Sequence, residues 1–202
     1  TPVILQAAAA GSTATLLSDA GGSNSFGTLA VGSAPGAGAS FVTVDVLNDR
    51  GDLVIGSVDG ITGIQDAVSV QIESTGNLTV NAAGSASQRL RLTSGASSTM
   101  FLNQILAAPT VLLRANRIID QPGAGDIFAT TLGLLGKQAL EGPNPEFTLI
   151  GANQVTNLGV VHETPDSQLG NVSFTNAGDL TVVGGTIDGE NFETRRTVAE
   201  SF

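Results

Sequence analysis

The chain has 202 residues, of which 41% are hydrophobic, so it is long enough to bury a sizeable core. Its 18 acidic and 8 basic side chains give a net charge of -10, which argues against nucleic acids and anionic membranes as partners because both attract basic surfaces. The absence of cysteine excludes disulfides and thiolate metal sites. With 26 Gly, 8 Phe and no Trp or Tyr, small and β-branched side chains must fill a narrow interior.

Short strands are predicted along the whole chain, because apolar and polar residues alternate in runs of about four to seven residues that end in Gly, Asn, Asp or Ser. The alternation is clearest in FVTVDVLN at 41–48 and in VSVQIES at 68–74. Further strands are expected in NLTVNA, QRLRLTS, TVLLRANRI, FTLIGA, NVSFTN and DLTVVGG. The best helical candidate is Ala129–Gly142, but its two internal glycines disfavour a helix.

Internal repeats favour a solenoid over a sandwich or a barrel. The triplet Gly51-Asp52-Leu53 recurs as Gly76-Asn77-Leu78 and as Gly178-Asp179-Leu180. The distance from the first triplet to the last corresponds to about six turns of roughly 21 residues, within the range of solenoid repeats. Stacked coils bury a continuous apolar column that one coil cannot bury by itself. We therefore predict an all-β, parallel β-helix (β-solenoid) of roughly nine or ten coils, forming a single domain over residues 1–202.

Four segments carry a resemblance to a known family: GNLTVNAAGS, TVLLRANRIIDQPGAGDI, GANQVTNLG and GNVSFTNAGDLTVVGGTIDG. In this order they resemble the repeat region of filamentous haemagglutinin-like adhesins, the large exoproteins of bacterial two-partner secretion. The resemblance implies a right-handed β-helix, export through an outer-membrane secretion pore, and a secreted or bacterial cell-surface location. Residues 48–189 are the expected repeat region, residues 1–47 N-terminal coils of weaker match, and residues 190–202 a polar tail or cap.

The expected function is that of a non-enzymatic adhesin stalk or extracellular fibre segment, with a receptor or glycan on a host or neighbouring cell as its partner. One alternative is a filament subunit that stacks its coils head to tail, and the tail ENFETRRTVAESF would then cap one end or pair with a neighbour. A second alternative is a β-helix that binds or cleaves polysaccharides. Because the chain starts at Thr1 and shows no signal peptide, we expect a piece of a longer protein.

The tripeptide Arg50-Gly51-Asp52 matches a motif that adhesion ligands present to integrins. The repeat accounts for the glycine and the aspartate, because Gly-Asp-Leu recurs at Gly178, and it leaves only Arg50 to be explained. Integrin-type ligands usually lie on protruding loops, whereas Leu53 should begin a stacked strand. We interpret the tripeptide as a repeat corner and retain the adhesion ligand as the alternative.

No cofactor, metal or catalytic residue is expected. Asp59 and Asp188, each followed by Gly, offer oxygen ligands to calcium, but Asp-Gly also suits tight turns that need no metal. The best enzyme-like cluster is Arg114, Arg117, Asp120 and Asp126, which we interpret as solvated charges on outer faces and corners.

The single histidine, His162, has Glu163 and Asp166 nearby but no second imidazole or thiolate that could complete a metal site. The chain also lacks the G-x-S-x-G pattern of a hydrolase nucleophile. We therefore expect a histidine in a surface loop.

Overall fold

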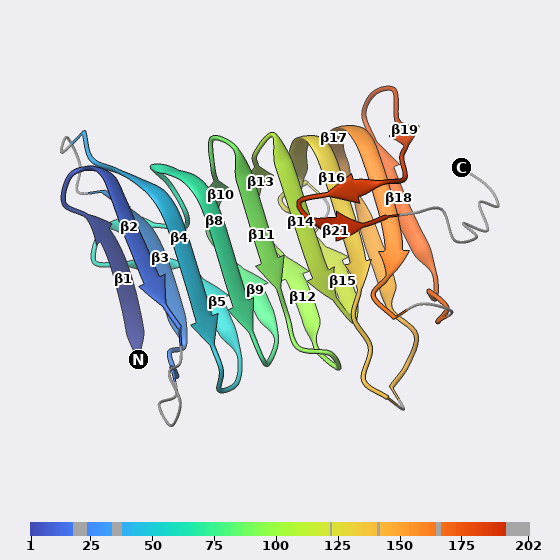
Figure 1. Ribbon diagram of the computed structural model, residues 1–202, viewed down its shortest axis with the longest axis horizontal. Helices are drawn as coiled ribbons and strands as arrows, with labels where there is room; N and C mark the ends of the chain where they lie inside the picture. Colours follow the sequence, from blue (N-terminus) through green and yellow to red (C-terminus); the bar gives the residue numbers. More distant parts are fainter. Residues whose placement is uncertain (18–23, 34–37, 122, 141, 165–166, 193–202) are drawn as a thin grey trace.

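The computed structural model describes residues 1–17, 24–33, 38–121, 123–140, 142–164 and 167–192, which wind into a parallel β-solenoid (Figure 1). The described residues form strands and no helix, and the coils follow one another along the long axis of the molecule. The prediction of an all-β parallel solenoid is confirmed. The chain makes about seven turns, so the predicted nine or ten coils are wrong.

The coils pass over two main faces, with a short third face between them in the middle coils, and we number the coils from the N-terminus. Strands of face 1 pair in parallel from one coil to the next. They are β1 (Pro2–Ala7), β3 (Thr28–Ser33), β5 (Leu53–Ile55), β9 (Leu78–Val80), β12 (Thr99–Leu102), β15 (Arg117–Asp120), the first part of β17 (Glu146–His162) and β18 (Val172–Asn176).

Face 2 contains the longer strands, which also pair in parallel through all coils. They are β2 (Ala10–Leu16), β4 (Ser40–Asn48), β8 (Ala67–Ser74), β11 (Arg89–Thr93), β14 (Thr110–Ala115), the end of β16 (Ile127–Gly136), the end of β17 and β19 (Thr181–Val182). Coil 4 therefore ends in β11, coil 5 in β14, coil 6 in β16 and coil 7 in β17, and the short strands β18 and β19 belong to a last, eighth layer that lies seven turns from the first.

Face 3 is short and lies between the other two, where β10 (Gly84–Ser85) pairs with β13 (Leu106–Ala107) and β13 pairs with the start of β16. Two antiparallel hairpins stand outside the coils. The first joins β6 (Ser57–Val58) to β7 (Ile61–Thr62), and the second joins β20 (Thr186–Ile187) to β21 (Glu190–Asn191).

The core is a set of apolar ladders, because alternation sends every second side chain of each strand inward. These ladder side chains are at most 3% exposed. On face 2 the register stacks Val44, Val70, Leu90, Val111, Leu132 and Leu158. On face 1 it stacks Leu53, Leu78, Met100, Ile118 and Phe147.

The coil count is lower than predicted because the period is not constant. Successive register partners between Val70 and Leu132 are 20 or 21 residues apart, as expected. From Val44 to Val70 the chain advances 26 residues, since the β6–β7 hairpin is inserted there, and a longer connection makes the step from Leu132 to Leu158 equally long. In addition, the β20–β21 hairpin adds no coil.

Two of the three predicted repeat triplets are structurally equivalent. Leu53 pairs with Leu78, so the first two triplets stack as neighbouring corners of face 1. The third triplet, Gly178-Asp179-Leu180, instead precedes β19 on face 2, because Thr181 pairs with Asn157. The helical candidate Ala129–Gly142 is also wrong in type, since residues up to Gly136 belong to β16 and pair with strands on both sides.

The predicted polar tail is only partly described. Glu190 and Asn191 belong to β21, and the hairpin lies against face 2 rather than over a coil end (Figure 1). Residues 193–202 of the tail lie outside the described part of the chain.

Candidate functional site

The tripeptide Arg50-Gly51-Asp52 forms the exposed corner between β4 and β5. Gly51 has a φ of 82°, a conformation that side chains with a Cβ resist. Its carbonyl oxygen accepts hydrogen bonds from Ser74 Oγ at 2.8 Å and from the backbone N–H of Gly76 at 3.0 Å. The corner is therefore held against the corner of the next coil, as the repeat predicts.

The Asp52 carboxylate is committed to the same stacking. Its Oδ1 accepts the backbone N–H of Asn77 at 2.8 Å, and its Oδ2 accepts Asn77 Nδ2–H at 3.3 Å. Arg50 is exposed and takes part in none of the ion pairs found among the described residues. The tripeptide thus presents a free guanidinium beside a carboxylate that is already bonded within the solenoid.

We expect Asp52→Ala to lower the free energy of unfolding by about 1 kcal/mol, because the amide of Asn77 loses its charged acceptor. Arg50→Ala is the matched control, and we expect a change within about 0.5 kcal/mol, as is usual for a surface substitution. Urea denaturation of both variants measures the difference. Equal losses, or a larger loss for Arg50→Ala, would contradict the assignment of Asp52 as a corner residue.

The Asp-Gly segments form hairpin turns. Asp59 and Gly60 connect β6 to β7, and Asp188 and Gly189 connect β20 to β21, with positive φ values at all four residues. Two successive positive φ values are typical of the type I′ turns that close two-residue hairpins, for which Asp-Gly is a preferred sequence. Turn geometry therefore explains both segments. Among the described residues, no three or more His, Asp or Glu side chains are grouped as a metal site would require.

The four residues of the enzyme-like cluster do not converge. Arg117 is exposed on β15, whereas Arg114 lies on the outer side of face 2 and pairs with Glu163. Asp120 and Asp126 approach each other at the corner of the next coil. The interpretation as solvated charges is wrong for Asp120, which is only 6% exposed.

His162 is buried at the end of β17 rather than placed in a surface loop, so that prediction is wrong. Its Nδ1 accepts the backbone N–H of Thr164 at 2.9 Å, and its Nε2 lies 3.1 Å from Gln138 Oε1. Both ring nitrogens thus have polar partners within the chain, and Nδ1 also lies 3.1 Å from the carbonyl oxygen of Thr164. Asp166, the proposed neighbour, lies outside the described residues.

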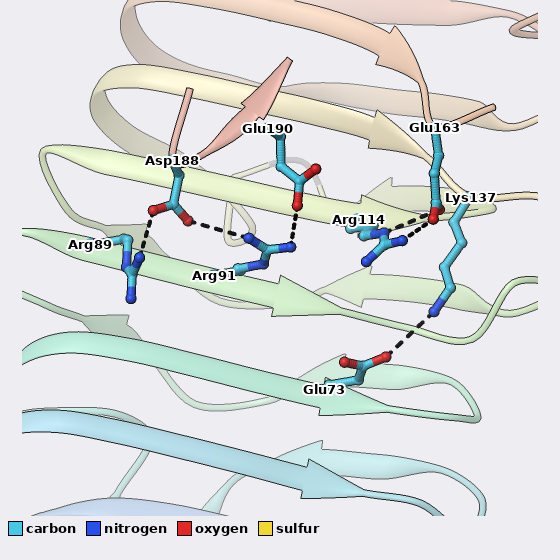
Figure 2. Close-up of polar contacts among 8 residues, drawn as sticks. All are labelled: Glu73, Arg89, Arg91, Arg114, Lys137, Glu163, Asp188 and Glu190. Carbon is cyan, nitrogen blue, oxygen red and sulfur yellow. Dashed lines mark hydrogen bonds and ion pairs between the residues drawn. The ribbon is translucent and has the colours of Figure 1, made fainter. Parts of the chain in front are cut away.

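The outer side of face 2 carries a group of ion pairs (Figure 2). It carries four of the six basic side chains that the structure describes, and each pairs with a carboxylate of another coil or of the β20–β21 hairpin. The pairs are Arg89–Asp188 at 2.7 Å, Arg91–Glu190, Arg114–Glu163 and Lys137–Glu73 at 3.5 Å. Each of these four cations therefore already has a carboxylate partner within the chain.

The β20–β21 hairpin also packs on this face through apolar side chains, and we call this contact the apolar seat. Ile187 and Phe192 are 5% and 2% exposed and pack with Leu112 and Leu135. The hairpin can approach closely because the outward positions beneath it are glycines. A Cβ added at Gly133 would lie 2.9 Å from Phe192 Cζ, and one added at Gly159 would lie at the same distance from Phe192 Cδ1.

The sequence contains a signal for this hairpin-binding surface, namely apolar residues at outward strand positions, where simple alternation predicts polar ones. Outward positions of β14, β16 and β17 hold Leu112, Leu135 and Val161, so each strand has an apolar doublet where alternation calls for one apolar residue. In coils 2 and 3 the corresponding outward positions include Asp45 and Gln71. A stretch of outward apolar residues confined to a few coils indicates that another segment covers them.

A shallow groove of about 650 Å³ crosses the corner between faces 3 and 2. Its lining comes from consecutive coils and consists mainly of small side chains, among them Ser40, Ala67, Ala86, Ser87, Ala108 and Pro109.

Comparison of the chain with protein-family models, with curated proteins and with solved structures gives no match. The resemblance to filamentous haemagglutinin-like adhesins therefore stays a prediction. Among the described residues, no helix has the length and apolar character needed to span a membrane.

Proposed function

We propose that the chain is a stiff, non-enzymatic segment of a secreted bacterial surface protein, serving as an adhesin stalk or as part of an extracellular fibre. The observation that carries the proposal is the unbroken parallel pairing on face 2, which joins every coil from β2 to β19. The backbone hydrogen bonds between strands run along the solenoid axis, and a continuous apolar core lies beneath them.

Adhesion in this proposal is multivalent and uses the outer faces. The outward ladder of face 1 presents both threonine and large apolar side chains from coil to coil, including Thr79, Phe101, Ile119 and Thr148. Each contact with a receptor or glycan would be weak, but many copies on one surface would add through effective concentration. The resemblance noted above supports export through an outer-membrane pore, and the strong preference of parallel crossover connections supports right-handed winding.

A filament subunit is the first alternative, and the two ends of the solenoid favour it. Among the described residues, β1 pairs only with β3 and β2 only with β4, while β18 and β19 both pair only with β17. Each end of the solenoid therefore has two strands with one open edge each. Open edges of parallel strands accept further strands. The next coils of a longer chain or a second copy of this chain would satisfy them equally well.

A polysaccharide-binding role is the second alternative, because the groove between faces 3 and 2 follows several coils. Cleavage has less support than binding. Asp120 is buried and bonded to the backbone of Gly151, and Arg114 is occupied by Glu163.

Electron microscopy and light scattering at micromolar concentration distinguish the stalk from the filament. We expect single particles with the 20.3 kDa mass of one chain, and a solenoid length of roughly 35 Å from seven strand spacings. Fibres with an axial repeat of about 4.8 Å would contradict the stalk and support the filament subunit.

Adhesion is tested on beads coated with the chain at increasing density and offered to cells. We expect cell binding to rise steeply with coating density, because weak contacts add through avidity. Beads coated with the Arg50→Ala variant should bind equally well. Failure to bind at any density would contradict the adhesive role, and loss of binding in the variant would make the tripeptide the ligand.

A further inference from the structure

Asp120 occupies a core position that is apolar in the preceding coils. The register of face 1 aligns it with Leu102, which aligns with Val80 and then with Ile55, and all three are fully buried. Asp120 itself is 6% exposed. An ionised carboxylate in such surroundings is strongly unfavourable unless a positive charge or several hydrogen bonds compensate it.

A second carboxylate meets Asp120 at the corner of coil 7. Asp120 Oδ2 accepts the backbone N–H of Gly151 at 2.7 Å, and Asp126 Oδ1 accepts the backbone N–H of Ala152 at 2.8 Å. A Cβ added at Gly151 would overlap Asp126 Oδ1 and would lie 3.1 Å from Asp120 Oδ2. The glycine thus leaves room at the point where two like charges converge.

The compensation found in the structure is incomplete. Asp120 Oδ1 is buried and has no hydrogen-bond partner, and none of the ion pairs among the described residues includes Asp120 or Asp126. Asp188 Oδ2 is a useful contrast, because it too lacks a hydrogen bond but has Arg91 Nη1 at 3.9 Å. Asp120 has no such cation. Its Oδ1 is therefore buried without a positive partner, while its Oδ2 shares the space at Gly151 with Asp126 Oδ1.

We propose that Asp120 and Asp126 bind one hard divalent cation of the calcium class at the corner between coils 6 and 7. Such cations take oxygen ligands, and two carboxylates with backbone oxygens and water supply a suitable set. The cation would neutralise both carboxylates while they hold the amides of Gly151 and Ala152, so it would fasten coil 7 to coil 6. This site is distinct from the Asp-Gly turns at Asp59 and Asp188.

Calcium is the probe for the test, which uses the full chain after treatment with a chelator. We expect calorimetric titration with calcium chloride to show one equivalent, and calcium at 100 times its dissociation constant to raise the Tm by about 5–10 °C. Asp120→Asn and Asp126→Asn should each weaken binding at least tenfold and remove most of the Tm shift. Asp59→Asn, which changes an exposed hairpin turn, should keep both.

Two results would overturn the proposal. One is the absence of binding and of any Tm shift with calcium, magnesium or manganese. The other is an equal calcium response in Asp120→Asn and in the unmodified chain. If the site instead holds a proton, Asp120→Asn will unfold at the same or a higher temperature with no dependence on cations, which also counts against a cation. If circular dichroism shows that Asp120→Asn does not fold, the calcium response of Asp126→Asn tests the proposal instead, because Asp126 is only half-buried.

Discussion

We expect Phe147→Ala to lower the free energy of unfolding by about 3–5 kcal/mol, the usual cost of truncating a fully buried phenylalanine. Phe147 is 0% exposed and stands in the face 1 ladder between Ile118 of coil 6 and Val172 of the last coil. No other aromatic side chain in the chain is as completely buried among the described residues. The cavity would open in the ladder between Ile118 and Val172, and a close-packed interior fills such a cavity only in part.

Phe101→Ala is the matched control, because Phe101 lies on the outer side of the same face and is 36% exposed. We expect it to lose no more than about 1.5 kcal/mol, since less apolar surface leaves the interior. Urea unfolding followed by circular dichroism measures both variants. Equal losses at the two positions would mean that the interior of face 1 does not dominate stability. Because coils interact mainly with their neighbours, Phe147→Ala should also unfold the C-terminal coils first.

The second expected result concerns the β20–β21 hairpin. We expect Gly133→Val to release the hairpin from face 2 and to leave the solenoid folded. The new side chain would point outward, where its Cβ would lie 2.9 Å from Phe192 Cζ and 2.7 Å from Leu112 Cδ1. Valine suits a β-strand, so β16 itself should tolerate the change. The lost burial of Ile187 and Phe192 corresponds to about 1.5–3 kcal/mol for each side chain.

Hydrogen exchange measured by mass spectrometry checks this expectation. Amides of residues 184–192 should exchange at least tenfold faster in Gly133→Val, whereas those of β8, β11 and β14 should keep their protection. Thr43→Val is the control, because it places the same side chain at an outward position of β4, in coil 2. Unchanged exchange in the hairpin of Gly133→Val would show that the glycine does not determine its docking.

The sequence predicts the fold well where one rule acts by itself. Alternation in 41–48 and 68–74 places Val44, Val46, Val70 and Ile72 in the core, and these four are at most 1% exposed. Val42, which continues the same alternation, is 48% exposed, because the pairing of β2 with β4 is irregular at that point. The Gly-x-Leu corners at Gly51 and Gly76 stack because Leu53 pairs with Leu78. Local pattern fails where chain length varies, because an inserted hairpin shifts the spacing without changing the motif. For this reason the triplet at Gly178 belongs to a different face from its relatives.

The candidate site was much harder to predict, because it depends on contacts between residues far apart in the sequence. Arg89 and Asp188 are 99 residues apart, and nothing near either residue indicates the other. In the sequence, the glycines of β16 suggest a helix break or a flexible segment. In the structure, position 133 requires a glycine because Phe192 lies over it. Asp120 likewise looks like a surface charge until the register aligns it with Leu102.

The hairpin also determines how tension would enter the molecule. It leaves β19 at the last coil and runs back along face 2, where Asp188 and Glu190 contact β11 of coil 4 (Figure 2). A pull on the backbone at Phe192 would therefore act on the flank and would first load the hairpin in shear across coils 4 to 7. Shear strains several ion pairs and the apolar seat at once, whereas a pull on β19 would peel one strand at a time. The last coil would thus be protected from peeling, the direction of force in which a solenoid loses its strands one by one.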